Sequence, residues 1–113
     1  MSDASLPHIE DLTIARLVGP PSHSRGRAYA ENGNVGDLEW DPATQTLRGE
    51  VRGTAPAPYR VTVKLLGANT GRITVRTAMC TCPVGINCKH AAAVLHASTA
   101  RRRAADAANV SAE

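Results

Sequence analysis

Aromatic residues are nearly absent from this sequence. Its 113 residues include no phenylalanine, one tryptophan and two tyrosines, although 42% of the residues are hydrophobic. A core must therefore be built from Val, Leu, Ile and Ala, which bury less surface per side chain than aromatic rings do. A chain of this length forms one domain. Because a small domain with a thin core usually needs a cross-link, we expect a disulfide or a metal ion to stabilise this one.

Long hydrophobic runs are also missing. No stretch approaches the roughly eighteen consecutive apolar residues that a membrane span requires. Residues 1–12 contain Asp3, Glu10 and Asp11 and no apolar run after a basic start, which is unlike a signal peptide. We therefore expect no membrane partner and a cytoplasmic location. Thiols stay reduced in that compartment, so a cysteine cluster there favours metal binding or catalysis over disulfides.

Acidic side chains are absent from one long stretch. Residues 51–105 contain nine Lys or Arg and no Asp or Glu, whereas residues 1–50 contain four basic and eight acidic residues. The formal net charge is only +3, so the distribution of charge is more informative than its total. This asymmetry favours a basic working surface for an anionic partner. The alternative is a solvated face whose counter-charges come from the acidic first half.

Alternating residues predict a sheet. Apolar and polar residues alternate across 35–40, 47–52, 59–65 and 72–77, and turn-forming residues separate these segments. We expect an α+β fold with a small antiparallel β-meander of three to four strands. Placing the Val, Leu and Ile side chains inside forces the cations of these segments onto the other face, offset by Glu50 alone. These cations are Arg48, Arg52, Arg60, Lys64, Arg72 and Arg76.

Two helices are expected outside these strands. After a proline pair at 20–21, Ser22 can cap a short helix that ends at Gly33. Residues 89–104 are rich in Ala, Leu and Arg, which favours a C-terminal helix, and the tail beyond it is expected to fray. Of the remaining histidines and aromatics, His8 and His23 are expected on the surface, and Trp40 and Tyr59 in the core.

Three cysteines lie within nine residues. Cys80, Cys82 and Cys88 are followed by His90, so four potential metal ligands fall within eleven residues. An odd number of clustered cysteines cannot form a complete set of disulfides. Tetrahedral zinc requires such a set of thiolate and imidazole donors, and the intervening Pro and Gly allow the chain to fold back. We therefore expect one structural zinc ion that joins the C-terminal helix to the sheet.

Other interpretations of the cluster stay open. The cysteines could be small buried hydrophobes, or a redox pair, although a Cys-x-Cys disulfide is strained. A catalytic zinc would need an open position and a nearby general base, and 51–105 contains no acid. His96 could replace His90 as the fourth ligand, but a helix turns it about 240° away and leaves it solvated.

The spacing around the cysteines resembles a known family. Cys-Thr-Cys-Pro at 80–83, then Cys-Lys-His at 88–90 and an Ala/Val/Leu helix, are similar to the SWIM zinc finger of bacterial Swi/Snf-type helicases and Mutator-like transposases. Arg25-Gly26 and Tyr59-Arg60-Val61 look like the lead-in of prokaryotic members, so the likeness covers roughly 25–97. It implies that Cys80, Cys82, Cys88 and His90 bind one zinc and that the domain contacts DNA or other proteins. The G-x-x-x-x-G-K-[ST] motif of an ATPase motor does not occur in this sequence.

These observations divide the chain into a weakly patterned lead-in at 1–20, a SWIM-like zinc-binding domain at 21–100, and a basic, then flexible tail at 101–113. We expect a binding module and not an enzyme. The leading hypothesis is DNA binding by Lys and Arg side chains that neutralise phosphates. The alternative is a protein-interaction adaptor with an acidic partner. The expected nucleic-acid-binding residues are Arg52, Arg60, Lys64, Arg72, Arg76, Lys89, Arg101, Arg102 and Arg103.

Overall fold

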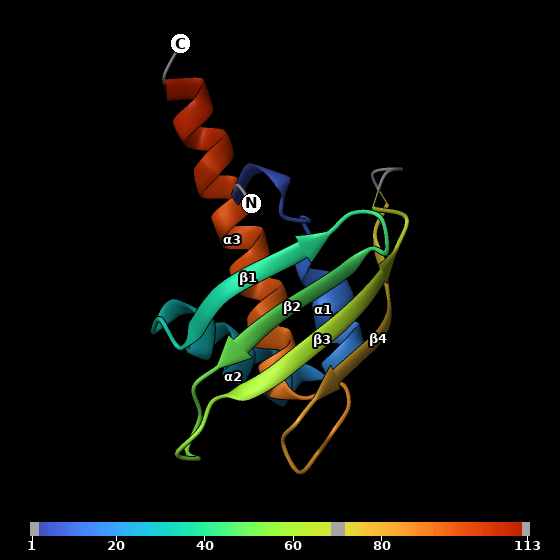
Figure 1. The fold of residues 1–113 in the computed structure, drawn as a ribbon, viewed down its shortest axis with the longest axis vertical. Coiled ribbons are helices and arrows are strands. Elements are labelled where there is room, and N and C mark those ends of the chain that lie inside the picture. The colour runs from blue at the N-terminus through green and yellow to red at the C-terminus, as the bar shows by residue number, and fades with distance from the viewer. Residues whose placement is uncertain (1–2, 69–71, 112–113) are drawn as a thin grey trace.

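The computed structural model of the chain describes residues 3–68 and 72–111. A four-stranded sheet carries all of its helices on one face, and the long C-terminal helix runs across that face (Figure 1). This arrangement confirms the predicted α+β fold with an antiparallel meander and a C-terminal helix. Among the described residues, no helix is long and apolar enough to cross a membrane.

The sheet follows the chain order. Strands β1 (Val35–Asp41), β2 (Thr46–Val51), β3 (Tyr59–Leu66) and β4 (Thr74–Cys80) pair antiparallel with their sequence neighbours. Alternation puts five apolar residues of β2 and β3 on the helical side, where they are almost completely buried. These residues are Leu47, Val51, Val61, Val63 and Leu65. The fourth strand begins two residues later than 72–77 predicted, and part of the loop before it, 69–71, lies outside the described residues.

Within the described ranges, four helical segments complete the fold: η1 (Asp3–Ser5), α1 (Asp11–Val18), α2 (Pro20–Glu31) and α3 (Lys89–Ser111). The prediction that the proline pair breaks the chain before a helix capped by Ser22 is wrong. Pro20 begins α2. Proline is tolerated there because the N–H groups in the first turn of a helix have no acceptor within the helix, so the missing N–H breaks no hydrogen bond. Ser22 therefore lies inside the helix. At the other end of the chain, α3 runs to Ser111, beyond the end expected near residue 104.

Helix α3 is the centre of the core. It contacts all four strands on one side and η1, α1 and α2 on the other. Its residues Ala91–Leu95 are therefore fully buried, although an amphipathic helix would expose one side. Thr99 of α3 is also buried, and its hydroxyl hydrogen-bonds both the N–H and the carbonyl oxygen of Ile9.

The N-terminal lead-in contributes to this core. Leu6, Ile9 and Ile14 are each at most 2% exposed, and Ser98 of α3 donates a hydrogen bond to the carbonyl oxygen of Pro7. Mixed apolar spacing left this segment without a predicted structure. In the fold it is fixed by tertiary contacts with α3, so helix α1 owes its stability to packing more than to its own sequence.

Candidate metal centre

The four predicted ligands converge at one end of the sheet. Cys80 ends β4, Cys82 lies in the following loop, and Cys88 and His90 flank the start of α3. Their donor atoms all lie within 4.8 Å of one another. Cys82, Cys88 and His90 are buried and Cys80 is partly buried. The cluster therefore joins the last strand to the central helix.

The donor distances fit a tetrahedral zinc ion. The Nδ1 atom of His90 lies 3.7 Å from the Sγ atoms of both Cys80 and Cys88. With zinc–sulfur and zinc–nitrogen bonds of about 2.3 and 2.0–2.1 Å, tetrahedral geometry separates sulfur and nitrogen by about 3.6 Å. The residues thus need little rearrangement to hold the ion. Four protein donors fill the tetrahedron, which is typical of a structural rather than a catalytic zinc.

The loop between β4 and α3 brings the donors together by folding back on the strand. Asn87 donates its N–H to the carbonyl oxygen of Ala78, and Cys80 donates to Gly85, both at 2.9 Å. Gly85 and Asn87 have φ values of 83° and 48°, in the left-handed region that Gly adopts freely and Asn tolerates. This reversal places Cys88 immediately before α3, where the N–H groups of the first helical turn oppose, without cancelling, the rise in its pKa that burial causes.

The thiols are not predisposed to ionise together without a metal. Burial raises the pKa of Cys80 to about 12, and burial also raises the pKa of Cys88. Burial acts in the same direction on Cys82, but hydrogen bonds from the Gly85 N–H and the neighbouring thiols outweigh it, so the pKa of Cys82 is lowered. A divalent cation compensates the charge of all three thiolates, and binding it releases protons.

Two tyrosines position His90. The ring of Tyr59 stacks on the imidazole with centroids 4.4 Å apart, and the ring of Tyr29 lies 5.4 Å away. Burial lowers the pKa of His90, which favours the neutral imidazole that binds metals. Gly53 makes room for the stack, because a Cβ there would lie 2.6 Å from Tyr59. Tyr59 was predicted as a core residue only; its spacing from the cysteines gave no signal of this contact.

Residues 59–98 match the family model of the SWIM zinc finger. This segment is a SWIM zinc finger. The match begins at β3 and includes all four ligands and the first turns of α3. Together, the match and the Cys3His donor set assign zinc as the ion of this centre. Comparison with curated proteins and with solved structures gives no match.

His90, and not His96, completes the SWIM centre. His96 lies about one and two-thirds turns further along α3 and outside the zinc cluster, as the helix phase predicted. The expectation that His96 is solvated is wrong, however, because its side chain is only 10% exposed. The prediction that His23 lies on the surface is wrong as well, since its side chain is 14% exposed and its ring lies against that of His96. Helices α1 and α2, whose packing the sequence did not reveal, cover this side of α3.

Four of the predicted nucleic-acid-binding cations remain exposed on or beside the sheet. Arg60 and Lys64 project from β3 on the face opposite to the helices, and Arg52 follows β2. Arg76 is exposed on β4, where the register with β3 shifts between the Lys64 and Leu65 pairs. These positions leave the four side chains accessible to a partner.

The outer sheet face carries more acid than predicted. Glu50 pairs across the strands with Arg60, and Glu39 of β1 pairs with Arg48. The expectation that Glu50 alone offsets the cations is therefore wrong. With Trp40 buried, alternation along β1 turns Glu39 outward. These acids belong to β1 and β2, whereas β3 and β4 contain none.

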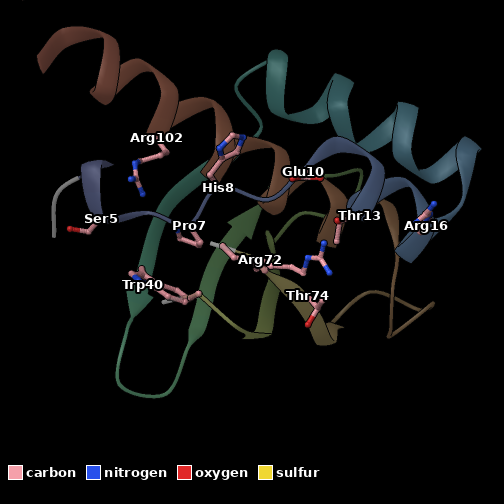
Figure 2. A pocket seen from close by; sticks show the side chains of 12 residues that line it. Ser5, Pro7, His8, Glu10, Thr13, Arg16, Trp40, Arg72, Thr74 and Arg102 are labelled. Carbon is pink, nitrogen blue, oxygen red and sulfur yellow. The ribbon is translucent and has the colours of Figure 1, made fainter. Parts of the chain in front are cut away.

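Arg72 does not share this face. It precedes β4 and extends toward Thr13 of α1, in a groove that Glu10 and Trp40 also line (Figure 2). The prediction that Arg72 projects outward from a strand is wrong, because the strand begins only at Thr74. The groove lies on the helical side of the sheet, away from Arg60.

The helical cations differ in accessibility. Arg101 donates hydrogen bonds to the carbonyl oxygens of Val35 and Gly36, and Arg102 donates to that of Leu6 and to the Asp106 carboxylate. These arginines tie α3 to β1 and to the lead-in. The other two predicted cations are Lys89, whose Nζ lies 5.7 Å from the centre of the Tyr29 ring, and Arg103, whose guanidinium lies 3.3 Å from the His8 ring.

Proposed function

We propose that this chain is a zinc-stabilised module that binds DNA through the outer face of strands β3 and β4. The observation that carries the proposal is the exposure of Arg60, Lys64 and Arg76 on two strands that contain no acidic residue. Cations on adjacent strands can contact successive phosphates of a nucleic-acid backbone. The zinc centre supports this role by fixing the end of β4 to α3.

Because phosphate contacts carry no sequence information, we expect the module to bind DNA with little sequence preference. The bound phosphates would release counterions, so affinity would fall steeply with salt. Trp40 is buried and Tyr59 stacks on His90, so neither ring is free to stack on an unpaired base. We therefore propose duplex DNA as the partner.

The proposal is tested by replacing Arg60 and Lys64 together with glutamine. Glutamine is preferred to glutamate because Glu50 pairs with Arg60. Each lost phosphate contact reduces the slope of log K against log salt by about 0.9, so the double variant should bind more weakly and show a slope smaller by about 1.8. Fluorescence anisotropy with labelled duplexes of unrelated sequence, measured over a range of salt, gives both values.

A matched control is the double variant of Arg16 and Arg25 to glutamine. These arginines are exposed on α1 and α2, so the same net charge is lost outside the sheet. The control should retain the salt slope of the unmodified protein. If both variants lost the same DNA affinity, the effect would come from net charge and not from a contact on the sheet. If the Arg60 and Lys64 variant lost no affinity, β3 would not be part of the interface. If Arg103→Gln instead abolished binding, the helix would be the contacting element.

A protein partner is the second candidate function, and exposed apolar side chains around the metal loop favour it. Met79, Val84 and Ile86 are 56%, 68% and 55% exposed, and Met79 pairs with Ile86 across the loop. This loop projects beyond the end of the sheet (Figure 1). An interaction made there would survive nuclease treatment and be lost in Val84→Ser, whereas the Arg60 and Lys64 variant would leave it intact.

We also propose that the module has no enzymatic activity and works in the cytoplasm. A four-ligand zinc centre offers no open position for a substrate or an activated water. Cysteines stay reduced in the cytoplasm and so remain available as three thiolate ligands, which supports the location.

A further inference from the structure

Three metal-binding side chains outside the zinc finger ligands meet where the helices come together. Asp11 begins α1, His23 lies in the first turn of α2, and His96 lies in the second turn of α3. One donor atom from each lies within 4.8 Å of the others. Up to 85 positions separate these residues in the sequence, so the packing of the helical layer alone creates the cluster.

The two imidazoles converge on one carboxylate oxygen. The Nε2 atom of His23 lies 3.0 Å from Oδ1 of Asp11, and the Nδ1 atom of His96 lies 3.8 Å from the same oxygen. The two rings meet edge to face with centroids 4.9 Å apart. Nitrogen and oxygen donors at about 2.0–2.1 Å from a tetrahedral ion are about 3.3 Å apart. Small side-chain movements therefore bring all three donors into coordination distance.

His96 is buried more completely than its hydrogen bonds explain. Its side chain is 10% exposed, and among the described residues its buried Nε2 atom has no hydrogen-bond partner. The 3.8 Å separation between Nδ1 and Asp11 exceeds hydrogen-bond length. Burying one ring nitrogen without a partner is costly, so His96 is held at this position by the packing around it. The other ring nitrogen, Nδ1, is the one that faces Asp11 and could donate to an ion there. Burial also lowers the pKa of His96, which favours the neutral ring that coordinates metals.

Arg27 occupies the carboxylate that a metal would use. Its guanidinium donates to Oδ1 of Asp11 at 2.6 Å, and this hydrogen bond is the main reason why the pKa of Asp11 is lowered. The Arg27 side chain is 48% exposed and the Asp11 side chain 60% exposed, so the arginine can move into solvent without disturbing the core. The arginine and a metal ion thus compete for the same oxygen.

We propose that Asp11, His23 and His96 form a second metal site, which binds a divalent transition ion of the zinc class through two imidazoles and one carboxylate. Three protein donors leave coordination positions for water, and this donor set suits zinc, cobalt or nickel. An ion there would fasten α1 and α2 to the central helix. The proposal is independent of DNA binding, because all three residues lie in the helical layer.

The test adds cobalt(II) to untagged protein that already holds one equivalent of zinc. Zinc fills the thiolate centre, so cobalt reports on the second site. We expect one cobalt per chain by equilibrium dialysis and elemental analysis, with weak ligand-field absorption and no thiolate-to-cobalt charge-transfer band. Asp11→Asn should weaken cobalt binding at least about tenfold, since even the outer-shell partners of metal ligands account for 10–100-fold in affinity. His8→Ala, which removes an exposed histidine elsewhere, should change nothing.

Arg27→Ala provides a test of opposite sign. Removing the competing guanidinium should tighten cobalt binding several-fold, whereas Arg25→Ala removes the same charge from an exposed position of the same helix and should have little effect. Binding of no cobalt by the zinc-loaded protein would overturn the proposal. So would unchanged cobalt affinity in Asp11→Asn, or an Arg27→Ala variant that behaves like Arg25→Ala. None of these variants replaces a buried side chain, so the test does not depend on a core substitution that could prevent folding.

Discussion

Cys88→Ser is expected to unfold the junction between β4 and α3. The side chain is buried at 3% exposure, immediately before the helix, and its sulfur lies 3.7 Å from the ligating nitrogen of His90. A serine hydroxyl stays protonated and cannot replace a thiolate. Structural zinc contributes on the order of 10 kcal/mol to folding in small metal-binding domains, which is comparable to the whole stability of most domains. The variant should therefore lose its zinc and most of its helical circular dichroism.

Val84→Ser is the matched control for this prediction. It places the same new side chain in the same loop, at a position that is 68% exposed and holds no ligand. Its zinc content and circular dichroism should equal those of the unmodified protein. A Cys88→Ser protein that kept both would show that the fold does not depend on the metal.

Gly26→Ala is expected to destabilise the protein, although alanine is the better helix former by about 1 kcal/mol. Gly26 lies where α2 crosses α3, and a Cβ there would lie 2.5 Å from the Cβ of Ala92 and 2.8 Å from the carbonyl oxygen of Lys89. The two helices would have to separate next to the zinc ligand His90. Overpacking of this kind costs about 1–3 kcal/mol. After the gain in helix propensity is subtracted, the net loss is up to about 2 kcal/mol, so thermal unfolding of the zinc-loaded protein should show a melting temperature lower by up to roughly 15 °C.

Ser24→Ala supplies the comparison within the same helix. Ser24 is exposed in α2, so alanine there gains helix propensity without meeting α3. Its melting temperature should rise slightly. If Gly26→Ala were also stabilising, the close approach of the two helices would not be a feature of the folded protein.

The sheet and the zinc centre were predictable because their signals are local. Alternation along β2 and β3 reflects one buried face, and the four ligands lie within eleven residues whose loop can close without the rest of the chain. The outward orientation of Glu39 could have been predicted in the same way, since Glu39 precedes the buried Trp40 on an alternating strand. The prediction placed Arg72 on a strand, but β4 begins only at Thr74. Where a strand begins depends on the conformation of the preceding loop as well as on the alternation of apolar and polar residues.

The helical layer could not be predicted in the same way. Helix α3 is alanine-rich and buried on both sides, so it has no apolar stripe to identify its partners. The contacts of His96 with His23 and Asp11 depend on how α1 and α2 pack against it. Tertiary packing of this kind leaves little trace in residue spacing, which explains why both histidines were expected in solvent.

The most direct test of the account is the two-dimensional NMR spectrum of the protein before and after zinc is removed by a chelator under reducing conditions. Zinc should join β4 to α3, and α3 contacts every other element of the core, so its removal should collapse the dispersed spectrum. Returning one equivalent of zinc should restore it. A spectrum that stayed native-like and dispersed after zinc removal would contradict the claim that the Cys80, Cys82, Cys88 and His90 centre holds this fold together.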